Sequence, residues 1–169
     1  MKQLIISSIN QNLNKAILLI DSLDSDLYTD GTVGPYYSSI GSHIRHALDF
    51  FDCIVKGIDD NNIDLTNRSR DQIIAENKEE AKQFIYRLQN ILLTYLNVPT
   101  DYLIHVTDNM GQGNVTVHYT LESVLAHANS HLIHHYATIG YILDYLNIRT
   151  EIPGFGYNPT TPDAKRKGI

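Results

Sequence analysis

Four stretches of the chain carry apolar residues at steps of three and four positions, which is the spacing of one helix face. They cover residues 2–23, 36–56, 69–97 and 121–146. Gly57 follows the second stretch and is a plausible helix stop. Four long amphipathic helices with short connections predict an all-α fold, and the simplest arrangement is a four-helix bundle.

The segment between the third and fourth predicted helices has a different pattern. Its two β-rich arms flank residues 109–113, which read NMGQG and are typical of a hairpin turn. The alternation of Val115, Val117 and Tyr119 predicts an arm with one half-buried face. The bundle is expected to occupy residues 1–150, and the Gly- and Pro-rich segment 151–169 is expected to be an irregular tail.

Composition narrows the function classes. A chain of 169 residues is one domain of ordinary size, and its net charge of −6 disfavours nucleic acid or an anionic membrane as a partner. No apolar run approaches the roughly 20 residues of a membrane span, and the N-terminus does not resemble a signal peptide. The single cysteine, Cys53, lies in an apolar run, so we expect a core residue in a cytoplasmic protein.

The candidate chemistry lies in the histidines. His127, His131 and His135 follow one another at four-residue steps and form one stripe on the last predicted helix. His131 and His135 lie deepest in the apolar stretch, and two imidazoles one turn apart can bind one metal ion. The second predicted helix carries His43 and His46, and either could supply a third ligand.

The remaining polar residues receive weaker assignments. His134 is expected at the rim of the site, and His127 at its mouth. His105 and His118 belong to the two hairpin arms, where a solvent-facing or cross-strand position is the default. Asp49 and Asp52 could orient an imidazole through a hydrogen bond, although a solvated helix face is the simpler interpretation for both.

Imidazole ligands limit the metal to zinc, nickel, copper or ferrous iron. Three protein ligands would leave a position for water or substrate, as catalytic sites do. The metal would then activate water or a thiol. A di-iron site is disfavoured, because it needs carboxylates at helical spacing from the histidines and Glu122 is the only glutamate in the fourth helix.

Two segments together, SSIGSHIRHALDFF and SHLIHHYATIGYIL, resemble the DinB-like superfamily of metal-dependent four-helix bundles. The resemblance implies a divalent ion, nickel or zinc, held by three histidines, and it implies a homodimer. It assigns His131 and His135 as the paired ligands and His46 as the third, with His43 as the alternative. Some members are transferases that use a low-molecular-weight thiol, and one is an isomerase.

The chain departs from better-known members directly after the double histidine. Those members often continue with Arg-Gly-Gln, whereas this chain has Tyr136, Ala137 and Thr138. The departure predicts a different substrate and leaves the expected ligands in place. The leading hypothesis is therefore a metal-dependent hydrolase or thiol transferase acting on a small molecule. The alternative is a stress-associated bundle that binds metal or a small ligand without catalysis.

Overall fold

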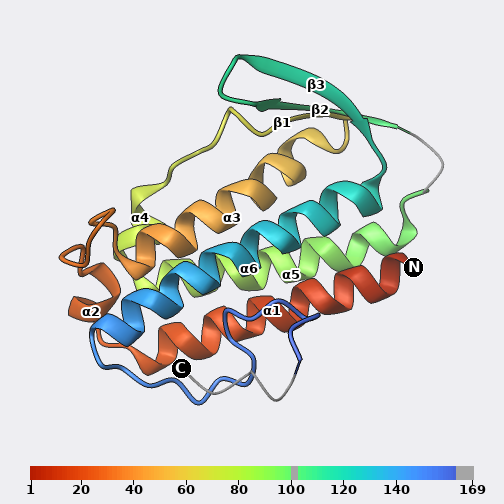
Figure 1. Ribbon diagram of the computed structural model, residues 1–169. Helices are drawn as coiled ribbons and strands as arrows, with labels where there is room; N and C mark the ends of the chain where they lie inside the picture. The colour runs from red at the N-terminus through yellow and green to blue at the C-terminus, as the bar shows by residue number, and fades with distance from the viewer. Residues whose placement is uncertain (100–102, 163–169) are drawn as a thin grey trace.

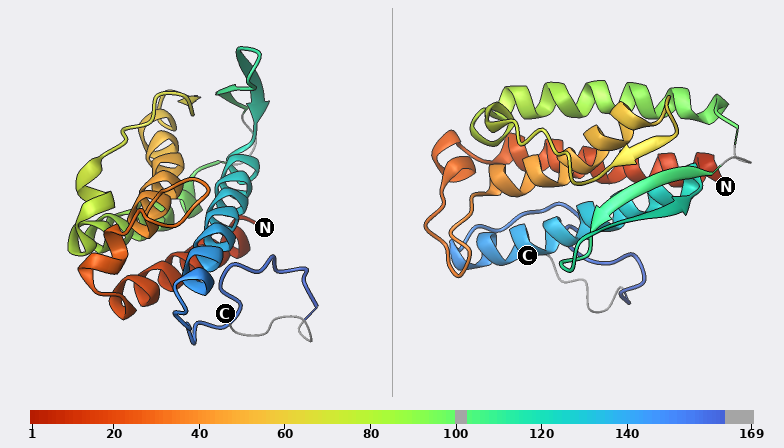
Figure 2. Two further views of the ribbon diagram at one scale, coloured as in Figure 1. Left: turned by 60° about the vertical axis from the view of Figure 1, so that its left-hand side comes forward. Right: turned by 90° about the horizontal axis from the view of Figure 1, so that it is seen from above.

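The computed structural model describes residues 1–99 and 103–162, and within them the chain is mostly helical. The four long helices are α1 (Lys2–Ser22), α3 (Ile40–Gly57), α5 (Lys78–Thr94) and α6 (Leu121–Tyr145). Both α1 and α3 pack against α5 and α6, and the views in Figures 1 and 2 show the four lying side by side. Their apolar stripes meet in one buried core.

Three shorter helices complete the helical part of the described residues. They are α2 (Ser25–Thr29), α4 (Gln72–Glu76) and the 3₁₀ helix η1 (Tyr95–Asn97). The periodicity at residues 2–23 predicted α1 well, but it gave no sign of α2, which begins because Asp24 accepts a hydrogen bond from the Leu27 amide.

Capping residues explain why the predicted bounds of two helices were wrong. The second begins at Ile40 and not at residue 36, because the Ser39 hydroxyl accepts a hydrogen bond from the Ser42 amide. The helix predicted over 69–97 is broken at Asn77, whose backbone is extended and whose side-chain oxygen accepts hydrogen bonds from the amides of Glu79 and Glu80. Local hydrogen bonding by one asparagine therefore divides that stretch into α4 and α5.

A small three-stranded sheet lies at one end of α3, with strand order β1 (Asn62–Asp64), β2 (Ile104–Asn109) and β3 (Asn114–Tyr119). Strands β2 and β3 are antiparallel, while β1 is parallel to β2 and was not predicted. The expected half-buried face of the second arm is wrong, since Val115 and Val117 are 43% and 46% exposed. β3 is one of the two edge strands, and no helix of the described residues covers it along its length.

The segment after residue 150 has no regular helix or strand within 151–162, yet part of it packs on the helices. The Phe155 ring is buried and stacks on Tyr136 of α6, with 4.7 Å between ring centroids. The rest of the predicted tail, 163–169, lies outside the described residues. No helix of the described part is both long and apolar enough to cross a membrane.

Candidate metal centre

Helices α3 and α6 pack along each other and bring the two histidine groups together. Their N-termini are fixed by hydroxyl caps, Ser39 on α3 and Thr120 on α6. The four-residue steps on α6 place His127, His131 and His135 on the face toward α3. The histidine stripe predicted for the last helix therefore lies on α6 and faces α3, which is the second predicted helix.

His46, His131 and His135 form a compact cluster, in which one ring nitrogen of each lies within 4.8 Å of the others. The ring centroids are 5.3 Å apart for His46 and His131, 4.8 Å for His46 and His135, and 4.6 Å for His131 and His135. The expected pair, His131 and His135, and the expected third ligand, His46, thus meet at one place.

Two atoms of the cluster are buried without a hydrogen-bond partner, Nε2 of His131 and Nε2 of His135. A buried polar atom that lacks a partner is unfavourable by about 1–3 kcal/mol. Both atoms belong to the residues that the four-residue spacing selected as the ligand pair. A divalent cation accepts the lone pair of a neutral imidazole, so the donor set of this cluster fits a metal ion.

The third member, His46, already contacts a cation. Nη1 of Arg68 lies 3.0 Å from Nε2 and 3.3 Å from Nδ1 of the His46 ring. Arg68 belongs to the loop between β1 and α4, 22 positions along the chain from His46. No sequence pattern linked it to the histidines, because a loop residue has no periodicity that fixes its direction.

His43 lies beside the cluster and not inside it. Its Nδ1 is 3.1 Å from Nδ1 of His135, and its Nε2 is 2.9 Å from the Ser38 hydroxyl. The alternative of His43 in place of His46 is therefore disfavoured by geometry. His43 instead contacts the ring nitrogen of His135 that faces away from the unpartnered Nε2, a contact that sequence reasoning did not anticipate.

Burial keeps these imidazoles neutral, which is the form that binds metal. Burial first, and then the charges of neighbouring groups, lower the pKa of His131 to about 4 and that of His135 to about 2. The pKa of His46 is lowered first by burial and then by the guanidinium groups of Arg68 and Arg45. The cluster therefore presents lone pairs at neutral pH.

The other histidines lie outside the cluster. The ring of His127 packs edge-on against Phe50 at 4.9 Å, and its Nδ1 is buried without a partner. His134 is exposed on α6, with its ring 6.5 Å from that of His131. His105 and His118 are directly opposite each other on β2 and β3, with 4.7 Å between ring centroids. Their expected cross-strand position is confirmed.

The two carboxylates considered for orienting an imidazole both pair with basic side chains of α3. Asp49 is buried and pairs with Arg45 at 2.7 Å, so it is not on a solvated face. Asp52 pairs with Lys56 at 2.7 Å and accepts a hydrogen bond from Ser69. Neither has a described hydrogen bond to a histidine, and both instead fix the loop that follows β1 against α3.

Tyr136, singled out as the departure after the double histidine, is a core residue. Its hydroxyl donates a hydrogen bond to the Asn12 carbonyl at 2.7 Å, and burial raises its pKa. Its ring stacks on Phe155, away from the cluster. The expectation that Tyr136 marks a change in substrate is not supported by this position, because helical geometry turns residue 136 about 100° from residue 135.

The comparison with protein families gives one match. A family model described as the DinB superfamily matches residues 10–139. That range includes α3, most of α6 and every histidine of the chain. No curated protein matches the chain significantly.

Proposed function

The chain belongs to the DinB superfamily, and from that membership and the histidine cluster we propose a metal-dependent enzyme acting on a small molecule. His46, His131 and His135 would hold a divalent ion; imidazole ligands suit several metals, and the family resemblance favours nickel or zinc among them. The helices α1, α3, α5 and α6 would be the four of the family's bundle. The observation that carries the proposal is the pair of unpartnered, buried Nε2 atoms on His131 and His135.

A bound ion would supply a Lewis acid that lowers the pKa of water or of a low-molecular-weight thiol, making either a nucleophile for hydrolysis or transfer. The protein's own residues prepare the site in other ways. Burial keeps the imidazoles unprotonated, and the Phe50 ring, 5.2 Å from that of His131, shields one side of the cluster from water.

His43 would fix the orientation of His135. With Nε2 of His135 free for the ion, Nδ1 carries the proton and donates it to Nδ1 of His43 at 3.1 Å. His43 then has its own proton on Nε2, where the Ser38 hydroxyl accepts at 2.9 Å. In this direction the chain of hydrogen bonds would hold His135 in the tautomer that presents Nε2 to the cluster.

The proposal is tested by activity of the protein loaded with nickel or zinc against panels of thiol-conjugation and ester- or amide-hydrolysis substrates. We expect turnover that is lost on chelation and in His135→Ala, and retained in His105→Ala. A loaded protein that binds one ion per chain yet turns over no substrate would favour the alternative, a non-catalytic binding protein. Turnover unaffected by chelation would contradict a metal-dependent reaction.

Two further features are proposed, a homodimer and a cytoplasmic location. Homodimer formation follows from the family resemblance and is tested by light scattering of the purified protein. A cytoplasmic location is consistent with one free, buried cysteine, Cys53. Burial raises the pKa of the Cys53 thiol to about 11, which keeps it in the unreactive thiol form.

A further inference from the structure

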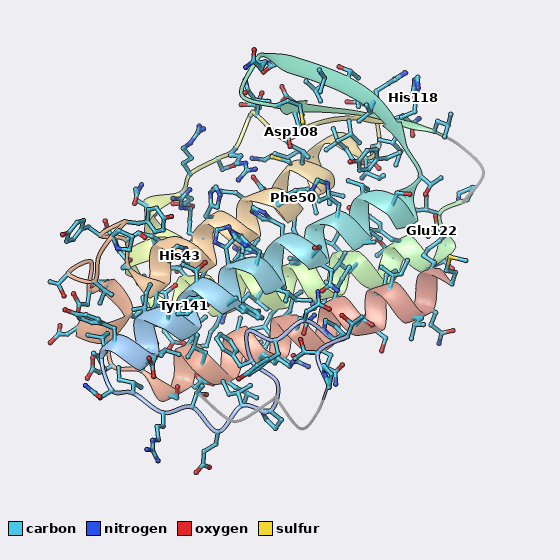
Figure 3. The ribbon with its side chains drawn as sticks, viewed as in Figure 1. His43, Phe50, Asp108, His118, Glu122 and Tyr141 are labelled. Atoms are coloured by element: carbon cyan, nitrogen blue, oxygen red, sulfur yellow. The ribbon has the colours of Figure 1, made fainter. Side chains whose placement is uncertain are left out.

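A cavity of about 410 Å³ opens where α3 begins and α6 ends. His43 of α3 and Tyr141 of α6 both line it, and Figure 3 shows them at the same end of the two helices. Its volume lies within the range of small-molecule sites. One wall comes from the loop before α3, through Pro35 and Tyr36. The cavity is therefore formed by two segments distant in sequence, residues 33–43 and 138–145.

Exposed aromatic side chains surround this cavity. Tyr36, Tyr141 and Tyr145 line it and are 78%, 79% and 70% exposed. Val33 and Ile142 add apolar surface. Three large, solvent-exposed tyrosines around one small cavity leave an apolar surface uncovered, and such surfaces commonly bind ligands. The open faces of phenol rings also attract cations.

The charge of the cavity is negative. Asp144 is the one charged side chain among its lining residues, and within the described part of the chain it has no ion pair. It lies in the last turn of α6, where the helix dipole adds negative potential. The N-terminus of α3 is the other helix end at this cavity. It attracts an anion less, because the Ser39 hydroxyl already caps the first turn of α3. The wall of the cavity thus attracts a positive group and repels a carboxylate.

The cavity adjoins the histidine cluster through a single residue. His43 lines it, and Nδ1 of His43 is 3.1 Å from Nδ1 of His135. Ser38, which contacts Nε2 of His43, lines it as well. The part of the cavity that His43 and Ser38 line therefore lies beside the cluster.

We propose that this cavity is the substrate pocket and that it takes a small organic cation, with a protonated amine or quaternary ammonium near Asp144 and an apolar body among the tyrosines. The assignment as a substrate pocket rests on the proposed function. It also predicts that an anionic thiol, if one is used, does not bind among these tyrosines.

The test uses benzyltrimethylammonium and phenylacetate as matched cationic and anionic probes, titrated into metal-free protein and followed by amide chemical shifts. We expect the cation to bind at least tenfold more tightly than the anion. Tyr141→Ala and Asp144→Asn should each weaken cation binding about threefold to tenfold. The controls Tyr86→Ala and Asp59→Asn change an exposed tyrosine and an exposed aspartate that do not line the cavity, and they should leave it unchanged.

Equal affinity for the two probes, or cation binding that survives both cavity variants, would overturn the inference. Uptake of nickel and zinc is measured on separate aliquots of the same metal-free preparations, so that the two proposals fail separately. Metal binding without cation binding would overturn the assignment of the cavity as a substrate pocket and would leave the proposed function unaffected. Cation binding by a protein that takes up neither nickel nor zinc would overturn the role of the cavity as the pocket of a metalloenzyme.

Discussion

At the residue scale, the histidines of the cluster tie the stability of the fold to pH. Histidines of the unfolded chain titrate near pH 6.5, whereas burial lowers the pKa of folded His131 to about 4 and of His135 to about 2. Between those values the unfolded chain binds protons that the folded chain does not. The free energy of unfolding of the metal-free protein should therefore fall as pH drops from 7 to 4, by at most about 1.4 kcal/mol per pH unit for each histidine.

Urea unfolding at pH 7, 6, 5 and 4 in the presence of chelator measures this dependence. The double variant with His131→Asn and His135→Asn removes both titrating rings and should show a flatter curve. A variant with the same pH slope as the wild type would show that other groups cause the dependence.

Tyr136 permits a second prediction at this scale. Replacing it with phenylalanine removes the hydroxyl that donates to the Asn12 carbonyl and keeps the ring stacked on Phe155. We expect Tyr136→Phe to lower the free energy of unfolding by about 0.5–1.5 kcal/mol, with metal affinity unchanged. Urea unfolding and a metal titration check both. Unchanged stability with altered metal affinity would place Tyr136 at the site and not in the core.

Single residues also show how much of the site the sequence could predict. His131 and His135 are four positions apart, so the helix alone places them together. His43 and His46 are three apart and about 60° apart around α3, and only the rotation of α3 against α6 decides which one reaches the pair. The position of Arg68 could not be predicted from the sequence for another reason, because it depends on the path of a loop.

At the scale of elements, the start of α3 depends on a glycine. A Cβ atom added at Gly41 would lie 2.1 Å from the Ala75 carbonyl oxygen and 2.6 Å from a ring carbon of Tyr28, whose hydroxyl donates to the Ile74 carbonyl. The Ala75 backbone and the buried Tyr28 ring would both have to move to make room for this atom. Gly41→Ala should therefore lower the free energy of unfolding by about 1–3 kcal/mol or more.

Thermal and urea unfolding measure this effect. Ser130→Ala, at an exposed position of α6, is the control and should change stability by less than about 0.5 kcal/mol. If Gly41→Ala were as stable as the control, the close approach of α3 to the chain around α4 would be wrong.

The long helices were predictable because a strong apolar period outweighs local detail. Their boundaries were not, since Ser39 and Asn77 act through side-chain hydrogen bonds that periodicity does not detect. The strand β1 is three residues long and pairs with β2 across about 40 positions, so no local pattern marks it. The exposed valines of β3 were also unpredictable, because an alternation of apolar and polar residues predicts a strand but does not show which elements cover its faces.

At the scale of the whole molecule, part of the segment 151–162 shares the core of the helices. Phe155 is buried against Tyr136, and Gly156 lies so close to α6 that a Cβ atom there would be 3.0 Å from the Tyr136 carbonyl oxygen. Phe155→Ala should therefore lower the free energy of unfolding by about 3–5 kcal/mol in a single transition. Tyr86→Ala, at a half-exposed ring, is the control for a surface change, and an equal effect of the two would contradict the packing.

The central claim is that His46, His131 and His135 bind one divalent ion. The most direct measurement is the metal content of tag-free protein after incubation with nickel or zinc and removal of the free ion. The account predicts close to one ion per chain for the wild type and for His105→Ala, and almost none for each of His46→Ala, His131→Ala and His135→Ala. A wild type without bound metal, or single variants that keep a full ion, would contradict it.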